Sequence, residues 1–399
     1  MKVYKDTMVY LFGEIASKLI PFLMLPYLTR TLGTEGFGYY SYYQVYLILG
    51  AVLMGMSQGG AITRYYYFYG NRTIGIPVIS GAVISVAISS VVIICCLFLN
   101  ELLLAIILSV ATTQELIVAQ LSLRQCQKKS AEYVGINLSV GILGAFLTIL
   151  FFSAFGDEYI YVFLATLFGN IFVLTFLLFK VAGFKCKINK RKLSLGIRYV
   201  FFLGVPLIPH QISIFAKGQA DKFFIYNFFG PDSLGVYSAA FQVSSVLSVI
   251  IIALNKATLP YFYEGLKSGK LSKSIMLNYS YATLLLPFVV FICSILVPET
   301  IFLFILGDGF GGAKEFFSIF SAGITLMVPY LIVVNYLFYY GKMKVISFAT
   351  IIGTIFYVLY LYFASQISIK AVSIGSALYQ VIPIFIFIFY IRRNNSEIK

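Results

Sequence analysis

The sequence predicts an all-α integral membrane protein with twelve transmembrane helices, arranged as two six-helix bundles that are related by a pseudo-twofold axis. Three observations predict this fold class. The chain of 399 residues is 60% hydrophobic and only 11% charged, and its mean hydropathy is +0.93. The apolar residues occur in continuous runs without the period-two alternation of barrel strands. A short motif near the N-terminus also returns in the second half of the chain.

The composition excludes several classes of protein. Soluble domains are roughly 45–50% apolar and about 25% charged, and disordered chains need low hydrophobicity, so neither class fits. Twelve spans of about 20 residues leave only about 160 residues for the loops, so there is no room for a soluble catalytic domain. The chain lacks the P-loop, HExxH and GxSxG signatures, and it has a single histidine. We therefore expect no enzyme and no cofactor, with H⁺ or Na⁺ as the candidate coupling ion.

Twelve apolar runs are long enough to span a bilayer, and a bilayer permits only helices or closed barrels. The first six lie at about 8–29, 38–58, 75–99, 102–123, 133–155 and 159–179. The last six lie at about 199–219, 235–257, 275–297, 316–338, 345–364 and 371–391. We predict an N-terminal bundle at 1–180, a basic cytoplasmic linker at 181–198 and a C-terminal bundle at 199–399.

The basic residues are distributed unevenly over the two sides of the membrane. When alternate loops are assigned to alternate sides, 23 of the 29 basic residues fall on the side that holds both termini and the linker. Cytoplasmic loops carry such an excess of lysine and arginine, so we predict that both termini are cytoplasmic. The opposite side carries five basic and nine acidic residues. The net charge of +14 therefore reflects topology, and we expect membrane lipids, not nucleic acid, as partners.

A repeated motif relates the two halves of the chain. Residues 33–41 read Gly-Thr-Glu-Gly-Phe-Gly-Tyr-Tyr-Ser, and residues 230–238 read Gly-Pro-Asp-Ser-Leu-Gly-Val-Tyr-Ser. At a constant offset of 197 residues, two glycines, an acidic residue and a Tyr-Ser pair coincide. Both copies lie between the first and second spans of their half, on the same side of the membrane. This placement indicates a parallel repeat, related by an axis along the membrane normal.

The first span carries two ionisable residues, Glu14 and Lys18. Their i, i+4 spacing places both side chains on one helical face, where they can pair. Lys18 lies about 15 Å into the span at 1.5 Å per residue. Ionisable groups at that depth normally face a polar interior. The two residues therefore either line a cavity or form a self-neutralising pair that only orients the helix.

Three further ionisable residues lie within the spans or beside them: Glu115, His210 and Asp221. Histidine and carboxylate groups at such positions can exchange protons in a coupled transport cycle, so these three and Glu14 are our ion-coupling candidates. The alternative for His210 is a buried neutral side chain that is bonded to a backbone carbonyl. The alternative for Glu115 is a structural pairing with another helix.

Prolines mark the first span of each half as a candidate hinge. The first span contains Pro21 and Pro26, and the seventh contains Pro206 and Pro209. Proline removes a helical hydrogen bond and kinks the helix, so these two helices are candidates for mobile or gating elements. The alternative is the ordinary tolerance of proline in membrane helices.

Basic residues near the spans are candidates for binding an anionic substrate. They are Lys18, Arg30, Arg64, Lys217 and Lys256. Arg64 and Lys256 lie at the cytoplasmic ends of the second and eighth spans, where cations can steer an anion into a cavity. For each residue taken alone, the alternative is anchoring at the cytoplasmic interface, which needs no ligand.

Residues 25–41 carry a family pattern, since they read Leu-Pro-Tyr-Leu-Thr-Arg-Thr-Leu-Gly-Thr-Glu-Gly-Phe-Gly-Tyr-Tyr-Ser. This stretch resembles the start of the polysaccharide-transport family, the Wzx-type flippase branch of the MOP (MATE-like) exporter superfamily. Members begin with a span that ends in a similar Leu-x-Arg-x-Leu-Gly-x-x-x-x-Gly-x-Tyr pattern. The segment 61–65, Ala-Ile-Thr-Arg-Tyr, and the short basic loops after the fourth span of each half also fit.

The resemblance implies the MATE-like fold and a flippase in the bacterial inner membrane. Its substrate would be an undecaprenyl-pyrophosphate-linked oligosaccharide repeat unit of O-antigen or capsule, carried from the cytoplasmic to the periplasmic leaflet. The resemblance further implies alternating access around a central cavity whose cationic groups bind the pyrophosphate. Other polysaccharide-assembly membrane proteins are implied as partners. Two departures are that the chain is shorter than lipid II flippases with fourteen helices and that its spans are poor in arginine.

Two other readings remain open. A drug/cation antiporter of the same superfamily would use the deep carboxylates Glu14 and Glu115 as its cation or proton sites. A membrane-embedded polysaccharide enzyme, such as a glycosyltransferase or a polymerase, would need a large periplasmic loop or a paired acidic motif at a membrane face. The longest loops on the predicted periplasmic side are short and carry no such motif.

Overall fold

The computed structural model describes residues 2–181 and 189–393, and its regular structure within these ranges is helical without any strand. The N-terminal helices are α1 (Lys2–Gly55), α2 (Gln58–Tyr69), α3 (Gly75–Phe98), α4 (Leu102–Cys126), α5 (Ser130–Phe155), α6 (Tyr159–Val181) and α7 (Lys190–Gly204). A 3₁₀ turn, η1 (Val205–Leu207), leads into α8 (Ile208–Lys267). The remaining elements are α9 (Lys273–Thr283), α10 (Leu286–Ile295), α11 (Glu299–Leu306), η2 (Asp308–Phe310), α12 (Ala313–Thr325), α13 (Met327–Tyr339), α14 (Met343–Ala364), α15 (Ile369–Leu378) and α16 (Val381–Arg393).

Internal contacts divide the chain into two compact units. The N-terminal unit contains the residues up to Tyr27 together with Tyr39–Phe215. The C-terminal unit contains Leu28–Gly38 together with the residues from Ala216 onward. The first loop of the chain therefore packs with the C-terminal unit, and α7 packs with the N-terminal unit. Part of the predicted linker between the bundles lies outside the described residues.

The described helices supply the twelve membrane passes that the sequence predicts. Nine helical stretches among them are long and apolar enough to cross a membrane. Two of these stretches, Ile15–Tyr69 and Lys190–Lys267, each contain one non-helical glycine and make two passes. The short helices α15 and α16 together supply one more pass. The chain is therefore a multi-pass membrane protein.

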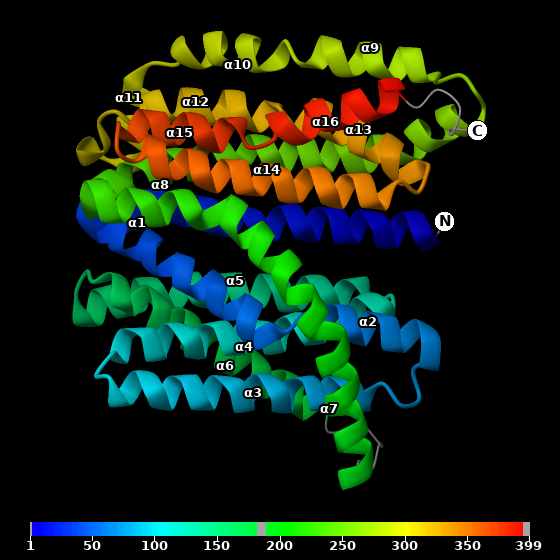
Figure 1. Cartoon of the computed structure of the whole chain (residues 1–399). Coiled ribbons are helices and arrows are strands. Elements are labelled where there is room, and N and C mark those ends of the chain that lie inside the picture. The colour runs from blue at the N-terminus through cyan, green and yellow to red at the C-terminus, as the bar shows by residue number, and fades with distance from the viewer. Residues whose placement is uncertain (1, 182–188, 394–399) are drawn as a thin grey trace. The chain divides into compact units, whose positions relative to one another are not determined.

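The non-helical positions in α1 and α8 are repeat-equivalent glycines. Gly33 has a φ of 66° and a ψ of −173°, and Gly230 has a φ of 83° and a ψ of 175°. Essentially only glycine adopts this backbone conformation. The chain turns back at Gly33, so that α1 forms a hairpin of two helices (Figure 1). The predicted loop at 30–37 is thus helical except at this one residue.

Four predicted spans are interrupted instead of continuous. The span at 199–219 passes from α7 through η1 into α8, and the other three divide into α9–α10, α12–α13 and α15–α16. A proline lies near the start of each following segment, at Pro206, Pro287, Pro329 and Pro383. Because proline lacks an N–H, it leaves the carbonyl four residues earlier without its helical partner. The missing hydrogen bond weakens the helix at each of these four positions.

In the N-terminal unit, α4 is the central helix. It packs against α2, α3, α5 and α6 (Figure 1). Its residues Ile107, Val110 and Ala111 are fully buried, whereas residues of α3 and α5 that face away from the unit are exposed. An apolar exposed surface is expected where helices contact lipid.

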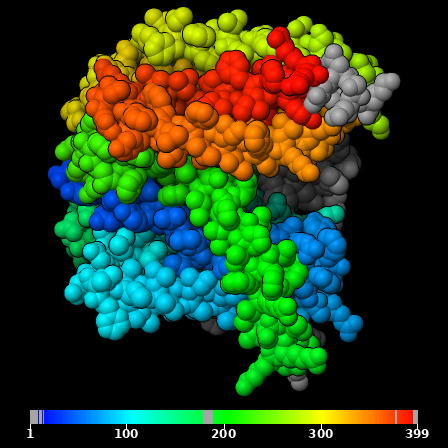
Figure 2. Space-filling model, viewed as in Figure 1, coloured from blue at the N-terminus to red at the C-terminus, as the bar shows by residue number. Residues whose placement is uncertain are grey.

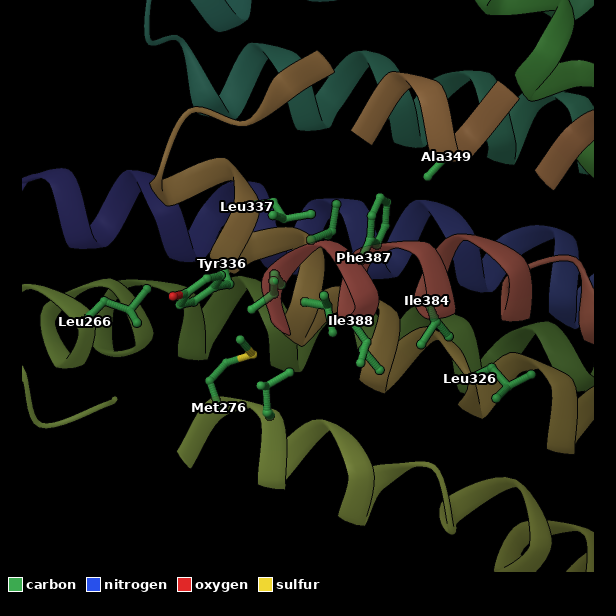
Figure 3. Close-up of a cluster of buried hydrophobic side chains, with 13 residues drawn as sticks. Leu266, Met276, Leu326, Tyr336, Leu337, Ala349, Ile384, Phe387 and Ile388 are labelled. Carbon is green, nitrogen blue, oxygen red and sulfur yellow. The ribbon is translucent and has the colours of Figure 1, made fainter. Parts of the chain in front are cut away.

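In the C-terminal unit, one apolar core joins α8, α9, α13, α14 and α16 (Figure 3). Tyr336 and Leu337 of α13 pack together with Phe387 of α16 and Met276 of α9, and each of the four is at most 2% exposed. The core holds the broken pass α15–α16 against α13. The break between α15 and α16 thereby places the polar side chain of Gln380 in the interior of the unit.

Candidate functional site

A polar cavity of about 240 Å³ lies inside the C-terminal unit. Its walls come from α8, the pair α12–α13 and the break between α15 and α16. The lining residues are Lys217, Gly218, Asp221, Phe241, Ser245, Ser248, Ile252, Phe320, Gly323, Ile324, Met327, Tyr379 and Gln380. The cavity brings together two predicted site residues, Lys217 and Asp221, which lie one helical turn apart on α8.

Asp221 is the buried acid of this cavity, with 4% of its surface exposed. Its carboxylate accepts a hydrogen bond from the hydroxyl of Tyr237 and another from the backbone N–H of Lys222, at 2.9 Å. A buried acceptor without such partners would cost about 1–3 kcal/mol, and more if it is charged. Asp221 and Tyr237 lie on opposite sides of Gly230, so their hydrogen bond ties the two arms of α8 together.

The position of Tyr237 is fixed by aromatic packing. The side chain is fully buried, and its ring meets the ring of Phe320 edge to face at a centroid distance of 4.8 Å. The ring of Phe316 lies 5.8 Å away in a similar arrangement. Such pairs stabilise a defined ring orientation. The packing therefore directs the Tyr237 hydroxyl at the Asp221 carboxylate.

Two lysines flank the acid. Lys217 lines the cavity, and the Lys222 ammonium lies 6.0 Å from the centroid of the Phe241 ring. Asp221 and Lys222 also interact electrostatically. Basic groups within a membrane protein normally face a polar interior and often mark a substrate or ion path. One acid with two bases gives this region a net positive charge when all three groups are ionised.

The sequence interpretation missed three polar residues beside this cavity, Tyr357, Tyr379 and Gln380. The rings of Tyr357 and Tyr379 lie 5.9 Å apart. The Gln380 amide donates a hydrogen bond of 2.9 Å to the Tyr379 hydroxyl, while its own carbonyl oxygen is buried without a hydrogen-bond partner. The Tyr357 hydroxyl is likewise buried without one. A glutamine within an apolar run was the signal available in the sequence.

The size of the cavity limits what it can hold. Small-molecule sites usually measure about 300–1,000 Å³, and this cavity is smaller. It can accept a proton, a small ion or one head-group-sized part of a larger substrate. Among the described residues, no group of three or more histidine, cysteine, aspartate or glutamate side chains is placed to bind a metal ion.

A second polar pocket, of about 340 Å³, surrounds Arg30 in the C-terminal unit. The Arg30 guanidinium donates a hydrogen bond to the backbone carbonyl of Phe304, near the C-terminal end of α11, and lies 6.0 Å from the centroid of the Phe304 ring. Gly307 and Asp308 complete the pocket near the arginine. A cation at the negative end of a helix is stabilising, and binding of a substrate by Arg30 stays a prediction.

In the N-terminal unit, Glu115 lies at the break between α1 and α2. Its carboxylate packs directly against Gly55. Met56 and Ser57, the next two residues, have positive φ values of 42° and 52°. The buried Gln58 side chain donates hydrogen bonds of 3.2 Å to the backbone carbonyl of Glu115 and to a serine hydroxyl on α3. Glu115 therefore contacts a strained turn, which the sequence did not indicate.

The remaining basic candidates are not among the residues that line the cavity. Arg64 is exposed, donates a hydrogen bond of 3.3 Å to the Tyr199 hydroxyl and lies 4.7 Å from the centroid of the Phe68 ring. Lys18 is exposed on α1 and Lys256 is exposed on α8. The structure therefore brings only Lys217 of the five basic candidates to the cavity beside Asp221.

Two ion-coupling candidates remain, Glu14 in the first span and His210 in the seventh. The Glu14 side chain lies outside the described residues, so its pairing with Lys18 stays a prediction. His210 is exposed in the first turn of α8 and belongs to the N-terminal unit, whereas Asp221 belongs to the C-terminal unit.

The four candidate hinge prolines fall into two groups. Pro21 and Pro26 lie inside α1 without interrupting it, and the backbone of that helix departs from helical geometry at Gly33 instead. Pro206 lies in the 3₁₀ turn η1, and Pro209 lies in the first turn of α8. The second pair therefore coincides with a change of helix type, and movement at either pair stays a prediction.

Comparison with known proteins gives matches along nearly the whole chain. A family model described as "Polysaccharide biosynthesis protein" matches residues 3–266. A Haemophilus influenzae protein described as "Lsg locus putative protein 1" is 40% identical over 396 residues, which cover 97% of this chain and 98% of that protein. A second protein from the same organism, described as "Uncharacterized membrane protein", is 38% identical over 361 residues, which cover 90% of this chain and 89% of that protein.

Solved transporter structures share the architecture at much lower identity. A MOP superfamily transporter from Pyrococcus furiosus has a TM-score of 0.64 and 14% identity, with 98% of this chain and 95% of that chain covered. The MATE transporter VcmN from Vibrio cholerae has a TM-score of 0.63 and 13% identity, with 100% and 98% covered. At these identities the likeness concerns the fold alone.

Proposed function

Because the chain belongs to the polysaccharide biosynthesis protein family, we propose that it is a flippase for lipid-linked oligosaccharides. The chain is a multi-pass membrane transporter with the fold of the MOP superfamily. Its proposed substrate is an undecaprenyl-pyrophosphate-linked repeat unit of O-antigen or capsule. The substrate passes from the cytoplasmic to the periplasmic leaflet of the inner membrane by alternating access. In this proposal both termini are cytoplasmic, and other polysaccharide-assembly membrane proteins receive the product.

The observation that carries the proposal is the cavity with Lys217 and Asp221 between apolar helices. A pyrophosphate group that crosses the hydrocarbon core needs a cation beside it, because moving an unpaired charge out of water is very costly. Lys217 supplies a cation at the cavity wall. The cavity volume of about 240 Å³ suits a head-group fragment and not the whole glycolipid.

Asp221 gives the proposed transport a means of coupling to an ion gradient. While the carboxylate is ionised, it neutralises a neighbouring lysine and weakens the hold on an anionic substrate. When the carboxylate takes up a proton or a Na⁺ ion, the positive charge of the cavity rises and anion binding is favoured. In this proposal H⁺ or Na⁺ is the coupling ion, and no organic cofactor takes part. Neither Lys217 nor Asp221 has to form a covalent intermediate, so the proposed transport needs no enzymatic step.

Deletion of the gene tests the function directly. We expect lipid-linked repeat units to accumulate with their sugars facing the cytoplasm, and surface polysaccharide to be lost. Protection of the sugars from a membrane-impermeant sugar-modifying reagent in intact spheroplasts measures which leaflet holds them. Normal surface polysaccharide in the deletion strain would contradict the proposal.

Complementation of that strain tests the cavity. Lys217→Ala should abolish complementation, whereas Lys217→Arg should retain part of it because the charge remains. Lys267→Ala, at the exposed C-terminal end of α8, is the matched control and should complement fully. Full complementation by Lys217→Ala at normal membrane abundance would remove this cavity from the mechanism. The same pair of changes at Lys18 tests the exposed candidate of the first span.

A second candidate function is a MATE-type drug/cation antiporter, and the buried carboxylate of Asp221 is the observation that favours it. A cationic substrate would bind an ionised acid, and Lys217 would oppose that binding. The two functions give opposite results in one assay. In an antiporter Lys217→Ala should leave cation export intact or increase it, and the deletion strain should become sensitive to cationic compounds while its surface polysaccharide stays normal.

A further inference from the structure

Helix α7 has one face that packs closely within the N-terminal unit. Gly196, Val200 and Gly204 recur at intervals of four residues, and all three are buried. A Cβ atom at Gly196 would overlap the side chain of Ser80 on α3, so only glycine permits this approach of the two helices. The Asn189 side chain accepts a hydrogen bond of 2.9 Å from the backbone N–H of Lys192 and caps the start of α7. The helix is thus a firmly held element of its unit.

The other face of α7 is both basic and apolar. Its exposed basic residues are Lys190, Arg191, Lys192 and Arg198. Its exposed apolar residues include Leu195, Phe201 and Phe202, which are 60%, 51% and 65% exposed. The Arg198 guanidinium lies 5.4 Å from the centroid of the Phe202 ring. Charge and large apolar side chains therefore share one surface.

The direction of α7 differs from that of the membrane-spanning helices in its unit. It runs transverse to α3, α4 and α6 (Figure 1), and its side chains form an exposed ridge (Figure 2). Since α3 and α4 are long and apolar enough to cross the membrane, a helix transverse to them near their ends runs along the membrane surface.

Another helix extends the basic surface. Arg64 on α2 reaches Tyr199 of α7, and this hydrogen bond places a fifth cation beside the helix. Tyr199 also meets the rings of Tyr65 and Tyr69, at centroid distances of 5.4 Å and 6.2 Å. Tyrosine rings of this kind are typical of the level of the lipid head groups.

We propose that α7 lies in the head-group region of the membrane and binds anionic phospholipids. Helices that lie in the membrane interface combine lysine and arginine with phenylalanine and leucine, and α7 carries both kinds of side chain on its exposed surface. Clustered basic residues next to a membrane span attract anionic head groups in a salt-dependent way. In α7 the aromatic groups enter the acyl boundary, and the basic groups contact the lipid phosphates above it. This function adds to substrate transport and does not depend on which substrate is carried.

The absence of tryptophan from the chain allows a direct test, because one introduced tryptophan is the sole indole fluorophore. The intact protein with Phe202→Trp is placed in phosphatidylcholine nanodiscs that contain either brominated phosphatidylglycerol or brominated phosphatidylcholine at equal mole fraction. Bromine quenches tryptophan on contact. We expect the anionic lipid to quench at least about twofold more strongly, and high salt to reduce the difference.

Two comparisons make the test specific. Phe172→Trp reports from an exposed position on α6, so the two brominated lipids should quench it equally. Changing the four basic residues of α7 to glutamine in the Phe202→Trp protein should abolish the preference. Equal quenching of Phe202→Trp by both lipids, or a preference that survives the four changes, would overturn the proposal. Loss of the preference on adding inorganic pyrophosphate at constant ionic strength would overturn it in favour of a substrate site.

Discussion

Gly38 and Gly235 each pack against a backbone carbonyl of the other copy of the repeated motif. A Cβ atom on Gly38 would overlap the carbonyl oxygen of Pro231, and one on Gly235 would overlap the carbonyl oxygen of Thr34. Pro231 follows Thr34 by the same 197 residues that separate the two glycines. The two contacts are therefore equivalent: each glycine meets the carbonyl that the repeat places opposite it. The Thr34 hydroxyl also donates a hydrogen bond of 2.7 Å to the Asp232 carboxylate, which joins the two copies of the motif. The two motifs form one local joint within the C-terminal unit.

Substitution at this joint should destabilise the protein. Gly38→Ala or Gly235→Ala forces backbone to move away from backbone, and we expect a loss of about 1–3 kcal/mol. The apparent melting temperature of the purified protein in detergent measures the effect. Gly60→Ala is the control, because a Cβ atom there meets nothing within 4 Å. Melting temperatures of Gly38→Ala and Gly60→Ala that agree would contradict the packing described.

Gly33 and Gly230 should be intolerant of substitution for a different reason. A Cβ atom at either position has open space around it, but the positive φ is strained for every other residue, by about 1–3 kcal/mol. We expect Gly33→Ala and Gly230→Ala to lower the melting temperature although they create no clash. Unchanged melting of both variants would mean that these turns relax at little cost.

The pair Asp221 and Tyr237 should show strong energetic coupling. Tyr237→Phe removes the hydroxyl and leaves a buried carboxylate short of a donor, which we expect to cost about 1–3 kcal/mol. In a background of Asp221→Asn the same change should cost less, because a neutral amide needs less stabilisation. A double-mutant cycle by thermal unfolding measures the coupling. Tyr261→Phe, at an exposed tyrosine of α8, is the control. Additive effects would show that the hydrogen bond contributes nothing to stability.

Glu115 and Gly55 should behave as a steric pair. Gly55→Ala places a methyl group where the Glu115 carboxylate lies, so the variant should be destabilised. Glu115→Ala removes the obstacle, and we expect the double variant to be more stable than Gly55→Ala alone. Membrane abundance and melting temperature report the suppression. A double variant that is less stable than either single variant would refute this arrangement.

The passes and their number were predictable because bilayer length and apolar composition determine them almost alone. The interruptions were not predicted, although each follows from a proline that the sequence displays. Pro329, for example, leaves the carbonyl of Thr325 unpaired, and α12 ends at that residue. The same prolines in other membrane helices cause only kinks, so the choice between a kink and a break depends on tertiary packing.

The candidate site was predictable where its residues are close in sequence. Lys217 and Asp221 share a helical face, and their spacing alone brings them together. Tyr357 and Gln380 come from distant helices, and only the packing of α14 against α15 and α16 brings Tyr357 beside Tyr379 at the cavity. Lys18, Arg30, Arg64 and Lys256 do not line this cavity, and their charge alone could not separate binding from anchoring, because charge near a span end equally serves anchoring.

The segment Leu28–Gly38 imposes an order on the biogenesis of the protein. Its arginine bonds to Phe304, a residue that lies 274 positions later in the chain. At about 5–20 residues per second, a ribosome needs about 14–55 s to reach that residue. During this interval the segment lacks Phe304, and its buried Phe37 lacks the ring of Phe310, which packs against it in the finished molecule. The segment is therefore synthesised early, and it can form its contact with Phe304 only after most of the chain has been made.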